Sequence, residues 1–158
     1  MTAIFASVVA VLGTLLGSLA TYAIQRSTVR QQQALAGVER RRQERVDAIA
    51  VYAEALTTYR RVRMDRWHSV NEDRDDQDTL RRQNYEVRAA AVSARLRVEL
   101  LVEDQELRKQ CRLALEVIEA MRPGITSEEF DQGRNESRTA LTRLVDAARK
   151  FLEQAQPG

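Results

Sequence analysis

The sequence predicts an all-α protein with a single N-terminal transmembrane helix, a long stem helix and an antiparallel helical bundle. Three observations predict it. Residues 2–24 contain no Asp, Glu, Lys, Arg or His, and the rest of the chain repeats apolar residues at helical spacing. With 6 Gly, 2 Pro and 5% aromatic residues in 158, the chain has little material for a turn-rich β fold. We expect a transmembrane helix at 2–24, an arginine-rich stem at 25–45 and a cytoplasmic bundle at 46–155.

The uncharged N-terminal segment is long enough to cross a bilayer. As a helix it would run about 34 Å, against about 30 Å of hydrocarbon. Arg26 and Arg30 follow the segment and nothing basic precedes it, so the positive-inside rule places the N-terminus outside and the rest in the cytoplasm. A signal peptide cleaved after Ala23, which would leave a secreted bundle, stays open as an alternative, although the basic n-region is missing.

Two glycines within this segment have the spacing of a membrane helix-packing motif. Gly13 and Gly17 are four residues apart, which lets two helices approach closely. The alternative is that glycine is simply common in membrane helices. Association of the chain with itself is therefore one of two open interpretations.

The stem is rich in arginine. Between residues 26 and 45 there are two glutamates and six arginines: Arg26, Arg30, Arg40, Arg41, Arg42 and Arg45. We favour a topology signal with a solvated helix face. Contact with anionic lipid headgroups and binding of nucleic-acid phosphates are the alternatives. Nucleic-acid binding predicts that the arginines from 40 to 66 form one unpaired face.

Apolar stripes at helical spacing predict the helices of the bundle. The stem helix carries Val38, Val46, Ile49, Ala53, Leu56 and Tyr59. The second helix carries Tyr85, Ala89, Val92, Leu96 and Leu100. The third carries Leu107, Cys111, Ala114, Ile118 and Met121, and the last carries Phe130, Leu141, Leu144, Val145, Ala148, Phe151 and Leu152. Helices with one apolar face bury these faces by packing against one another. We therefore expect an antiparallel bundle.

Local signals predict where these helices begin and end. Residues 71–78 hold five acids and one base and form a solvated loop. Asp104 can cap the third helix, and Pro123-Gly124 should stop it. Thr126 and Glu129 have the spacing of a capping box for the last helix.

The sequence contains no recognisable catalytic or metal-binding constellation. His68 and Cys111 are the only residues of their kinds, and the six glycines form no phosphate-binding loop. The acidic loop fails as a calcium site because Asp78 stands where a glycine is needed. Trp67 could stack on a base, but we expect it to close the bundle end or contact another chain. We expect no enzyme activity, no cofactor, no metal and no small-molecule substrate.

Several segments of the chain resemble the KilB-type proteins of Streptomyces plasmids and their chromosomal relatives. They are VAVLGTLLGSL at 9–19, the Gln/Arg-rich stem, YRRVRMDRW at 59–67, and AVSARLRVELL at 91–101 followed by DQELRKQCRLAL at 104–115. The resemblance implies a membrane-associated accessory to conjugative transfer, or to spread of plasmid DNA between hyphae. It implies no site residues.

These observations together predict a single-pass membrane adaptor whose bundle binds a protein partner, with plasmid transfer as the process. The alternatives are a membrane-tethered nucleic-acid-binding protein that uses the arginine-rich stem, and a secreted bundle released by signal cleavage.

Overall fold

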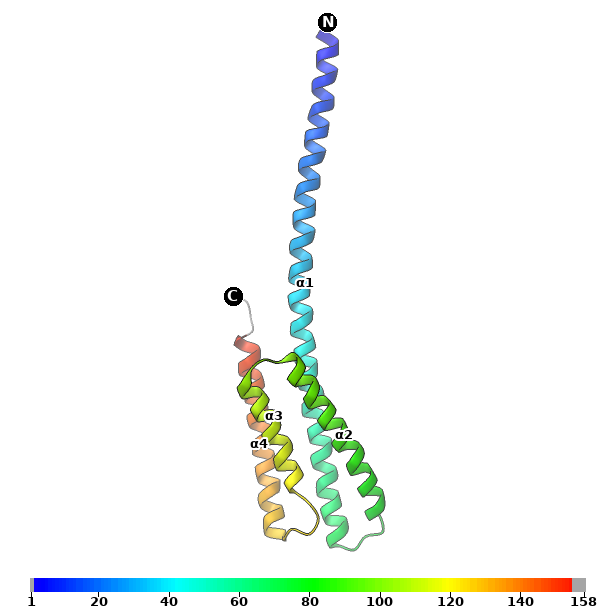
Figure 1. Cartoon of the computed structure of the whole chain (residues 1–158), viewed down its shortest axis with the longest axis vertical. Helices are drawn as coiled ribbons and strands as arrows, with labels where there is room; N and C mark the ends of the chain where they lie inside the picture. Colours follow the sequence, from blue (N-terminus) through cyan, green and yellow to red (C-terminus); the bar gives the residue numbers. More distant parts are fainter. Residues whose placement is uncertain (1, 155–158) are drawn as a thin grey trace. The chain divides into compact units, whose positions relative to one another are not determined.

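The computed structural model describes the backbone of residues 2–154 and the side chains of residues 36–154. In this part the chain forms four helices: α1 (Thr2–Asn71), α2 (Gln77–Leu101), α3 (Gln105–Ala120) and α4 (Ser127–Gln154). The chain divides into two units, Met1–Arg41 and Arg42–Gly158. The second unit is an antiparallel bundle in which successive helices run in alternating directions (Figure 1). The predicted all-α class and helical bundle are therefore confirmed.

The side chains described do not include the predicted membrane segment. No helix within residues 36–154 combines the length and apolar character that membrane crossing requires. The segment 2–24, with Gly13 and Gly17, and the flanking Arg26 and Arg30 lie outside the described side chains. The transmembrane helix and its orientation stay predictions from the sequence.

Helix ends form as the local sequence signals predict. The Asp104 carboxylate accepts a hydrogen bond from the Leu107 N–H at 2.7 Å, which satisfies one unpaired donor of the first turn of α3. Gly124, with φ of 91°, adopts the left-handed conformation after α3 that glycine allows without strain. At the start of α4, the Glu129 N–H donates to Thr126 Oγ1 at 3.2 Å and the Thr126 N–H to Glu129 Oε2 at 2.8 Å. The predicted cap and capping box are confirmed.

The apolar stripe predicted for α3 forms the centre of the core. Its five residues are all buried: Leu107, Cys111, Ala114, Ile118 and Met121. On α1, Ile49, Leu56 and Tyr59 are buried as predicted, whereas Val38 is 44% exposed. On α4, Phe130, Leu144 and Ala148 are buried, whereas Val145 is 49% exposed. The stripes of these three helices thus face the core over most of their length.

The stripe predicted for α2 was wrong except at Val92, which is half-buried and packs against the core. The residues of α2 that face the core are Leu80, Asn84, Ala91, Ala94 and Val98. At 3.6 residues per turn they lie on the side of the helix opposite to the predicted stripe. Ala91 and Ala94 have small side chains, so α2 can approach its neighbours closely on this side. The prediction from helical spacing instead picked out the larger apolar residues of the opposite face.

A buried hydrogen bond joins the first and third helices at mid-core. The Tyr52 hydroxyl donates to the Cys111 carbonyl oxygen at 2.7 Å, and neither residue is exposed to solvent. On the outside of the bundle, Arg88 and Glu119 form an ion pair at 2.7 Å between α2 and α3. This hydrogen bond holds α1 and α3 in one relative position, because breaking it would leave the Tyr52 hydroxyl and the Cys111 carbonyl buried without a partner.

We expect Tyr52→Phe to lower the free energy of unfolding by about 1 kcal/mol, because it removes one buried hydrogen bond while keeping the ring. Tyr85→Phe is the matched control, since Tyr85 is 62% exposed, and it should leave stability unchanged. Urea titration followed by circular dichroism measures both. Equal midpoints for the two variants would contradict the role of the Tyr52 hydroxyl.

Candidate functional site

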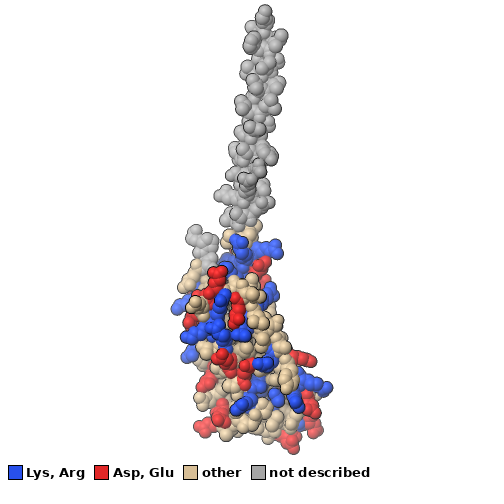
Figure 2. Space-filling view, in the orientation of Figure 1, with Lys and Arg blue, Asp and Glu red and all other residues tan. Residues whose placement is uncertain are grey.

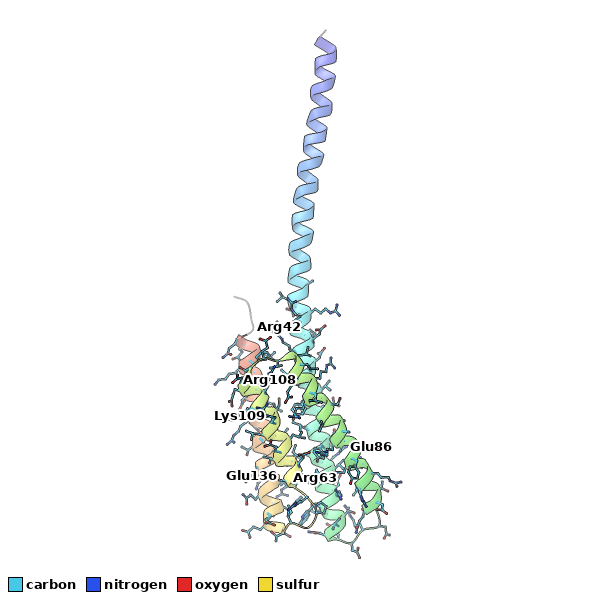
Figure 3. All side chains as sticks on the ribbon, in the orientation of Figure 1. Arg42, Arg63, Glu86, Arg108, Lys109 and Glu136 are labelled. Atoms are coloured by element: carbon cyan, nitrogen blue, oxygen red, sulfur yellow. The ribbon has the colours of Figure 1, made fainter. Side chains whose placement is uncertain are left out.

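Arginines of α1 bind the carbonyl groups at the C-terminal ends of α2 and α3. Arg45 donates from Nε to the Leu101 carbonyl at 3.0 Å. Arg63, labelled in Figure 3, donates from Nη2 to the Glu119 carbonyl. The last carbonyls of a helix lack an intrahelical partner and carry partial negative charge. A guanidinium therefore donates the hydrogen bonds that these carbonyls lack, and its positive charge is attracted to them.

Arg108, near the start of α3, binds carbonyl groups at the C-terminal end of α2 and just after it. Arg108 donates from Nη2 to the Glu99 carbonyl at 2.9 Å and from Nε to the Val102 carbonyl (Figure 3). The Val102 N–H closes back on the Val98 carbonyl at 2.9 Å. The C-terminal end of α2 is thus held by arginines from two other helices.

The seam between α1 and α4 is held by Arg60. Its Nε donates to Ser137 Oγ at 2.8 Å and its Nη2 to the Arg134 carbonyl at 3.2 Å. Burial lowers the pKa of Arg60, and the charges of Arg134 and Arg138 lower it further. Burial also lowers the pKa of Arg63, which is only 7% exposed.

The arginines of the predicted stem have different surroundings. Arg40 and Arg41 are exposed, and Arg42 is half-buried. Arg45 is held by Leu101 and lies 6.0 Å from the centre of the Phe151 ring. Arg26 and Arg30 lie outside the described side chains. The structure therefore assigns Arg45 a packing role that the sequence did not reveal.

The arginines from 40 to 66 do not form the single unpaired face that nucleic-acid binding by the stem predicts. The guanidinium groups of Arg45, Arg60 and Arg63 donate hydrogen bonds to groups within the bundle. On the face of residues 36–154 that Figure 2 shows, basic and acidic side chains are interspersed. Binding of nucleic acid by the stem stays an alternative from the sequence, because Arg26 and Arg30 lie outside the described side chains.

Trp67 closes one end of the bundle. Its ring stacks on Phe130 with centroids 4.0 Å apart and planes 9° from parallel, and Nε1 donates to the Ile125 carbonyl at 3.3 Å. His68 contacts the edge of the same ring, with centroids 5.1 Å apart. Trp67 is 6% exposed, so the prediction that it closes the bundle end is confirmed.

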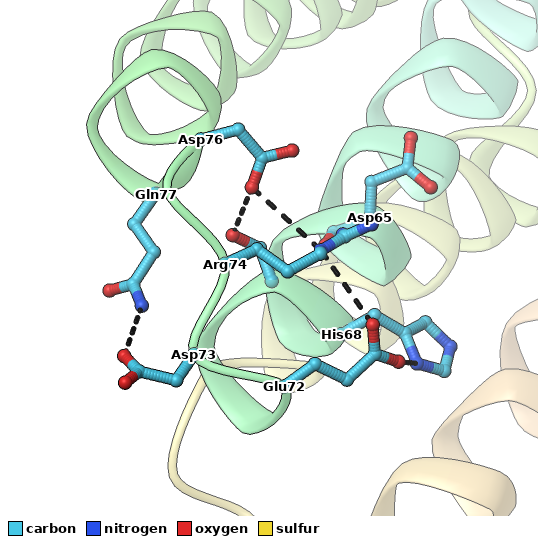
Figure 4. Close-up of polar contacts among 8 residues, drawn as sticks. Asp65, His68, Glu72, Asp73, Arg74, Asp76 and Gln77 are labelled. Atoms are coloured by element: carbon cyan, nitrogen blue, oxygen red, sulfur yellow. Dashed lines mark hydrogen bonds and ion pairs between the residues drawn. The ribbon is translucent and has the colours of Figure 1, made fainter.

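The acidic loop between α1 and α2 binds to its own chain (Figure 4). Arg74 lies 3.7 Å from the Glu72 carboxylate and 3.8 Å from that of Asp76, and it donates to the Asp65 carbonyl at 3.0 Å. Asp76 also accepts from the Ser69 hydroxyl.

The remaining loop contacts are of the same kind. Glu72 lies 3.2 Å from His68 Nδ1, and Asp73 accepts from Gln77 at 3.4 Å (Figure 4). Within residues 36–154 no three His, Cys, Asp or Glu side chains are grouped so as to hold a metal ion. These carboxylates serve the helix connection.

The solvent-facing side of α2 carries several exposed apolar side chains. We call it the outer apolar stripe, and it consists of Tyr85, Ala89, Val92, Leu96 and Leu100. Tyr85 is 62% exposed, Leu96 48% and Leu100 85%, while Val92 is half-buried at the edge of the core. An aligned apolar face of this kind marks a contact site for another protein more often than a scatter of single residues does.

A shallow groove between α3 and α4 is the second surface feature. Leu113, Val117 and Ala140 line it, with polar side chains from both helices around them: Gln110, Asn135, Glu136, Thr139 and Arg143. The lining combines one basic and one acidic group with amides and a hydroxyl. This set offers contacts to a ligand, but it contains no nucleophile paired with a base.

Cys111 is a buried thiol with depressed reactivity. Burial raises its pKa to about 12, and the nearby Glu99 carboxylate acts in the same direction. The thiolate is the reactive form, so at neutral pH this side chain acts as a small apolar core residue.

The described residues define a helical-bundle protein that offers surfaces for contact and a well-packed interior. The chain belongs to the KilB plasmid transfer protein family, whose model matches residues 46–152. That match covers the bundle and begins just after the stem arginines. No curated protein and no solved structure matches the chain.

We expect Arg63→Ala to lower the free energy of unfolding by about 2 kcal/mol, because it removes a charged donor from the Glu119 carbonyl together with a buried stem. Arg61→Ala is the matched control. Arg61 is exposed and makes no ion pair or hydrogen bond with the described part of the chain, so its loss should cost under about 0.5 kcal/mol. Denaturant titration separates the two, and equal losses would contradict the carbonyl-capping role.

We expect the chain to lose stability as the pH rises from about 9 to about 12. In that interval an unfolded chain releases the Cys111 proton, whereas burial raises the pKa of the folded thiol to about 12. The folded state then binds more protons, so the free energy of unfolding falls with pH. Burial also raises the pKa of Tyr52, which acts with the same sign above pH 10.

The measurement is urea titration at successive pH values on the parent chain and on Cys111→Ala. The variant should lose less stability per pH unit, by at most about 1.4 kcal/mol. Identical slopes would show that the Cys111 thiol does not contribute.

Proposed function

We propose that the protein is a single-pass membrane-anchored accessory protein of plasmid transfer whose helical bundle docks a protein partner. The observation that carries the transfer role is the family match over residues 46–152. The match covers the bundle, so the bundle is the part through which the chain would act in transfer.

The sequence before the bundle supports a membrane anchor. Residues 2–24 are uncharged over a length that spans a bilayer, and Arg26 and Arg30 follow on one side only. In this proposal the segment spans the cell membrane, the N-terminus lies outside, and the bundle lies in the cytoplasm. Arg26 and Arg30 would lie near anionic lipid headgroups.

The surface of the bundle supports an adaptor role. The outer apolar stripe presents Tyr85, Leu96 and Leu100 to solvent, and apolar faces of this kind are covered when another protein binds. The interior of the bundle supports a binding role without chemistry. Cys111 is buried, and Arg45, Arg60 and Arg63 donate hydrogen bonds within the bundle. The proposed activity is therefore binding, without a chemical step.

We expect deletion of residues 2–24 to move the protein out of the membrane fraction and to lower plasmid transfer to the level of a strain that lacks the gene. Transfer frequency between donor and recipient cells is the readout, with immunoblotting to show equal amounts of protein. Replacing 2–24 with an unrelated membrane-spanning helix is the control, and it should restore both properties.

Two outcomes would contradict the proposal. Unchanged transfer in the gene deletion would refute the accessory role, and unchanged transfer after deletion of 2–24 would refute the need for an anchor. The intact mass of the purified protein tests the secreted alternative, because signal cleavage would remove the N-terminal segment.

A further inference from the structure

The two halves of α2 are attached to the bundle in different ways. The N-terminal half, which we call the α2 arm, comprises residues 77–90. Its two buried side chains are those of Leu80 and Asn84, and neither belongs to the main hydrophobic core. Val87 of the arm is half-buried and packs against the edge of that core. The C-terminal half of α2 instead contributes three buried residues to the core itself: Ala91, Ala94 and Val98.

Polar contacts show the same difference between the two halves. Arg45 of α1 and Arg108 of α3 donate hydrogen bonds to carbonyl groups within residues 99–102, at the C-terminal end of α2. The arm carries an ion pair with α3, between Arg88 and Glu119, whose side chains are 52% and 33% exposed. Ion pairs that solvent reaches contribute little to stability, because water screens them. The C-terminal half is therefore held more firmly than the arm.

The arm also buries a polar side chain without a full set of partners. Asn84 is 4% exposed, and no group in the described part of the chain donates a hydrogen bond to its Oδ1. A buried amide oxygen without a donor costs free energy that contact with water recovers. Separation of the arm from the bundle would hydrate this oxygen, so Asn84 favours the separated state.

We propose that the α2 arm is a conformational device that opens as a unit while the C-terminal half of α2 stays in place. Isolated helices shorter than about 12–15 residues are marginal in water, so residues 77–90 unravel once they lose contact with the bundle. Segments with few buried apolar contacts are the ones that open locally in folded proteins. The rest of the bundle keeps its packing, because its core does not contain Leu80 or Asn84.

Opening of the arm changes the outer apolar stripe. Tyr85 and Ala89 of the stripe lie on the arm, whereas Val92, Leu96 and Leu100 lie on the C-terminal half of α2. The closed arm therefore presents the full stripe, and the open arm presents only its second part. If the stripe docks a partner, as the proposed function holds, closure of the arm controls that surface.

The opening itself goes beyond the proposed function and does not depend on it. Hydrogen exchange of the purified chain tests the opening, whereas a transfer assay tests the function. The failure of one therefore leaves the other standing.

The first experiment follows amide hydrogen exchange of the full chain in detergent micelles by mass spectrometry. We expect the amides of residues 85–90 to exchange at least about tenfold faster than those of residues 94–99 in the same helix. Equal rates would overturn the proposal. Fast exchange confined to residues 77–80 would also overturn it, because that is ordinary fraying of a helix end.

A substitution at Asn84 tests the cause of the opening. Asn84→Leu replaces the buried amide with an apolar group of similar shape, so it should slow exchange of residues 85–90 at least about tenfold. Thr79→Leu is the matched control, because Thr79 is exposed on the same arm and Thr and Asn have similar helix propensities. It should slow exchange at most about threefold.

Two comparisons interpret these variants. Unchanged exchange in α3 shows that the bundle of each variant is intact. If Asn84→Leu slows exchange of the arm no more than Thr79→Leu does, the buried amide is not the cause and the proposal fails.

Trypsin gives an independent measurement at exposed arginines of α2. Arg88 lies on the arm and Arg97 on the C-terminal half, and both are exposed. Proteolysis of a folded chain requires local opening around the cleaved bond. We expect cleavage after Arg88 to be faster than cleavage after Arg97, and Asn84→Leu to slow only the former. Cleavage after Arg97 at an equal or higher rate would overturn the division of α2 into two halves.

Discussion

The bundle depends on how the C-terminal carbonyl groups of its helices are satisfied. The last turns of α2 and α3 end beside other helices, where an unpaired carbonyl would be costly. Arg45 and Arg63 of α1 and Arg108 of α3 donate to these carbonyls. Because a guanidinium offers several donors in a fixed plane, one side chain can hold two groups, as Arg108 does with Glu99 and Val102.

These contacts change how the high arginine content of the chain is explained. Of 25 basic residues only Lys109 and Lys150 are lysines, which at first suggests surfaces for phosphate binding. Several arginines of the described part instead act as links between helices, and their alkyl stems add to the packing. Arg45, Arg60 and Arg63 donate hydrogen bonds within the bundle, whereas the exposed apolar side chains of α2 lie on its outer face.

The extent to which the sequence predicts this structure differs from helix to helix. On α3 the apolar positions, the Asp104 cap and the buried Cys111 all follow from spacing, because that helix has one apolar face. On α2 the same reasoning chose the wrong face, because the helix has two apolar faces and the larger residues lie outside. The links formed by Arg60 and Arg63 were also missed. Their positions four residues after Leu56 and Tyr59 place them on the buried side, and this signal could have revealed them.

By itself the sequence determined the helical class, the positions of the caps, the uncharged N-terminal segment and the resemblance to the KilB family. These are local properties or patterns along one chain, so they need no knowledge of neighbours. The tertiary structure alone decided which face of α2 is buried and which arginines are held inside. Both depend on contacts between residues distant in sequence, such as Arg45 with Leu101 and Tyr52 with Cys111, and periodicity contains no information about those partners.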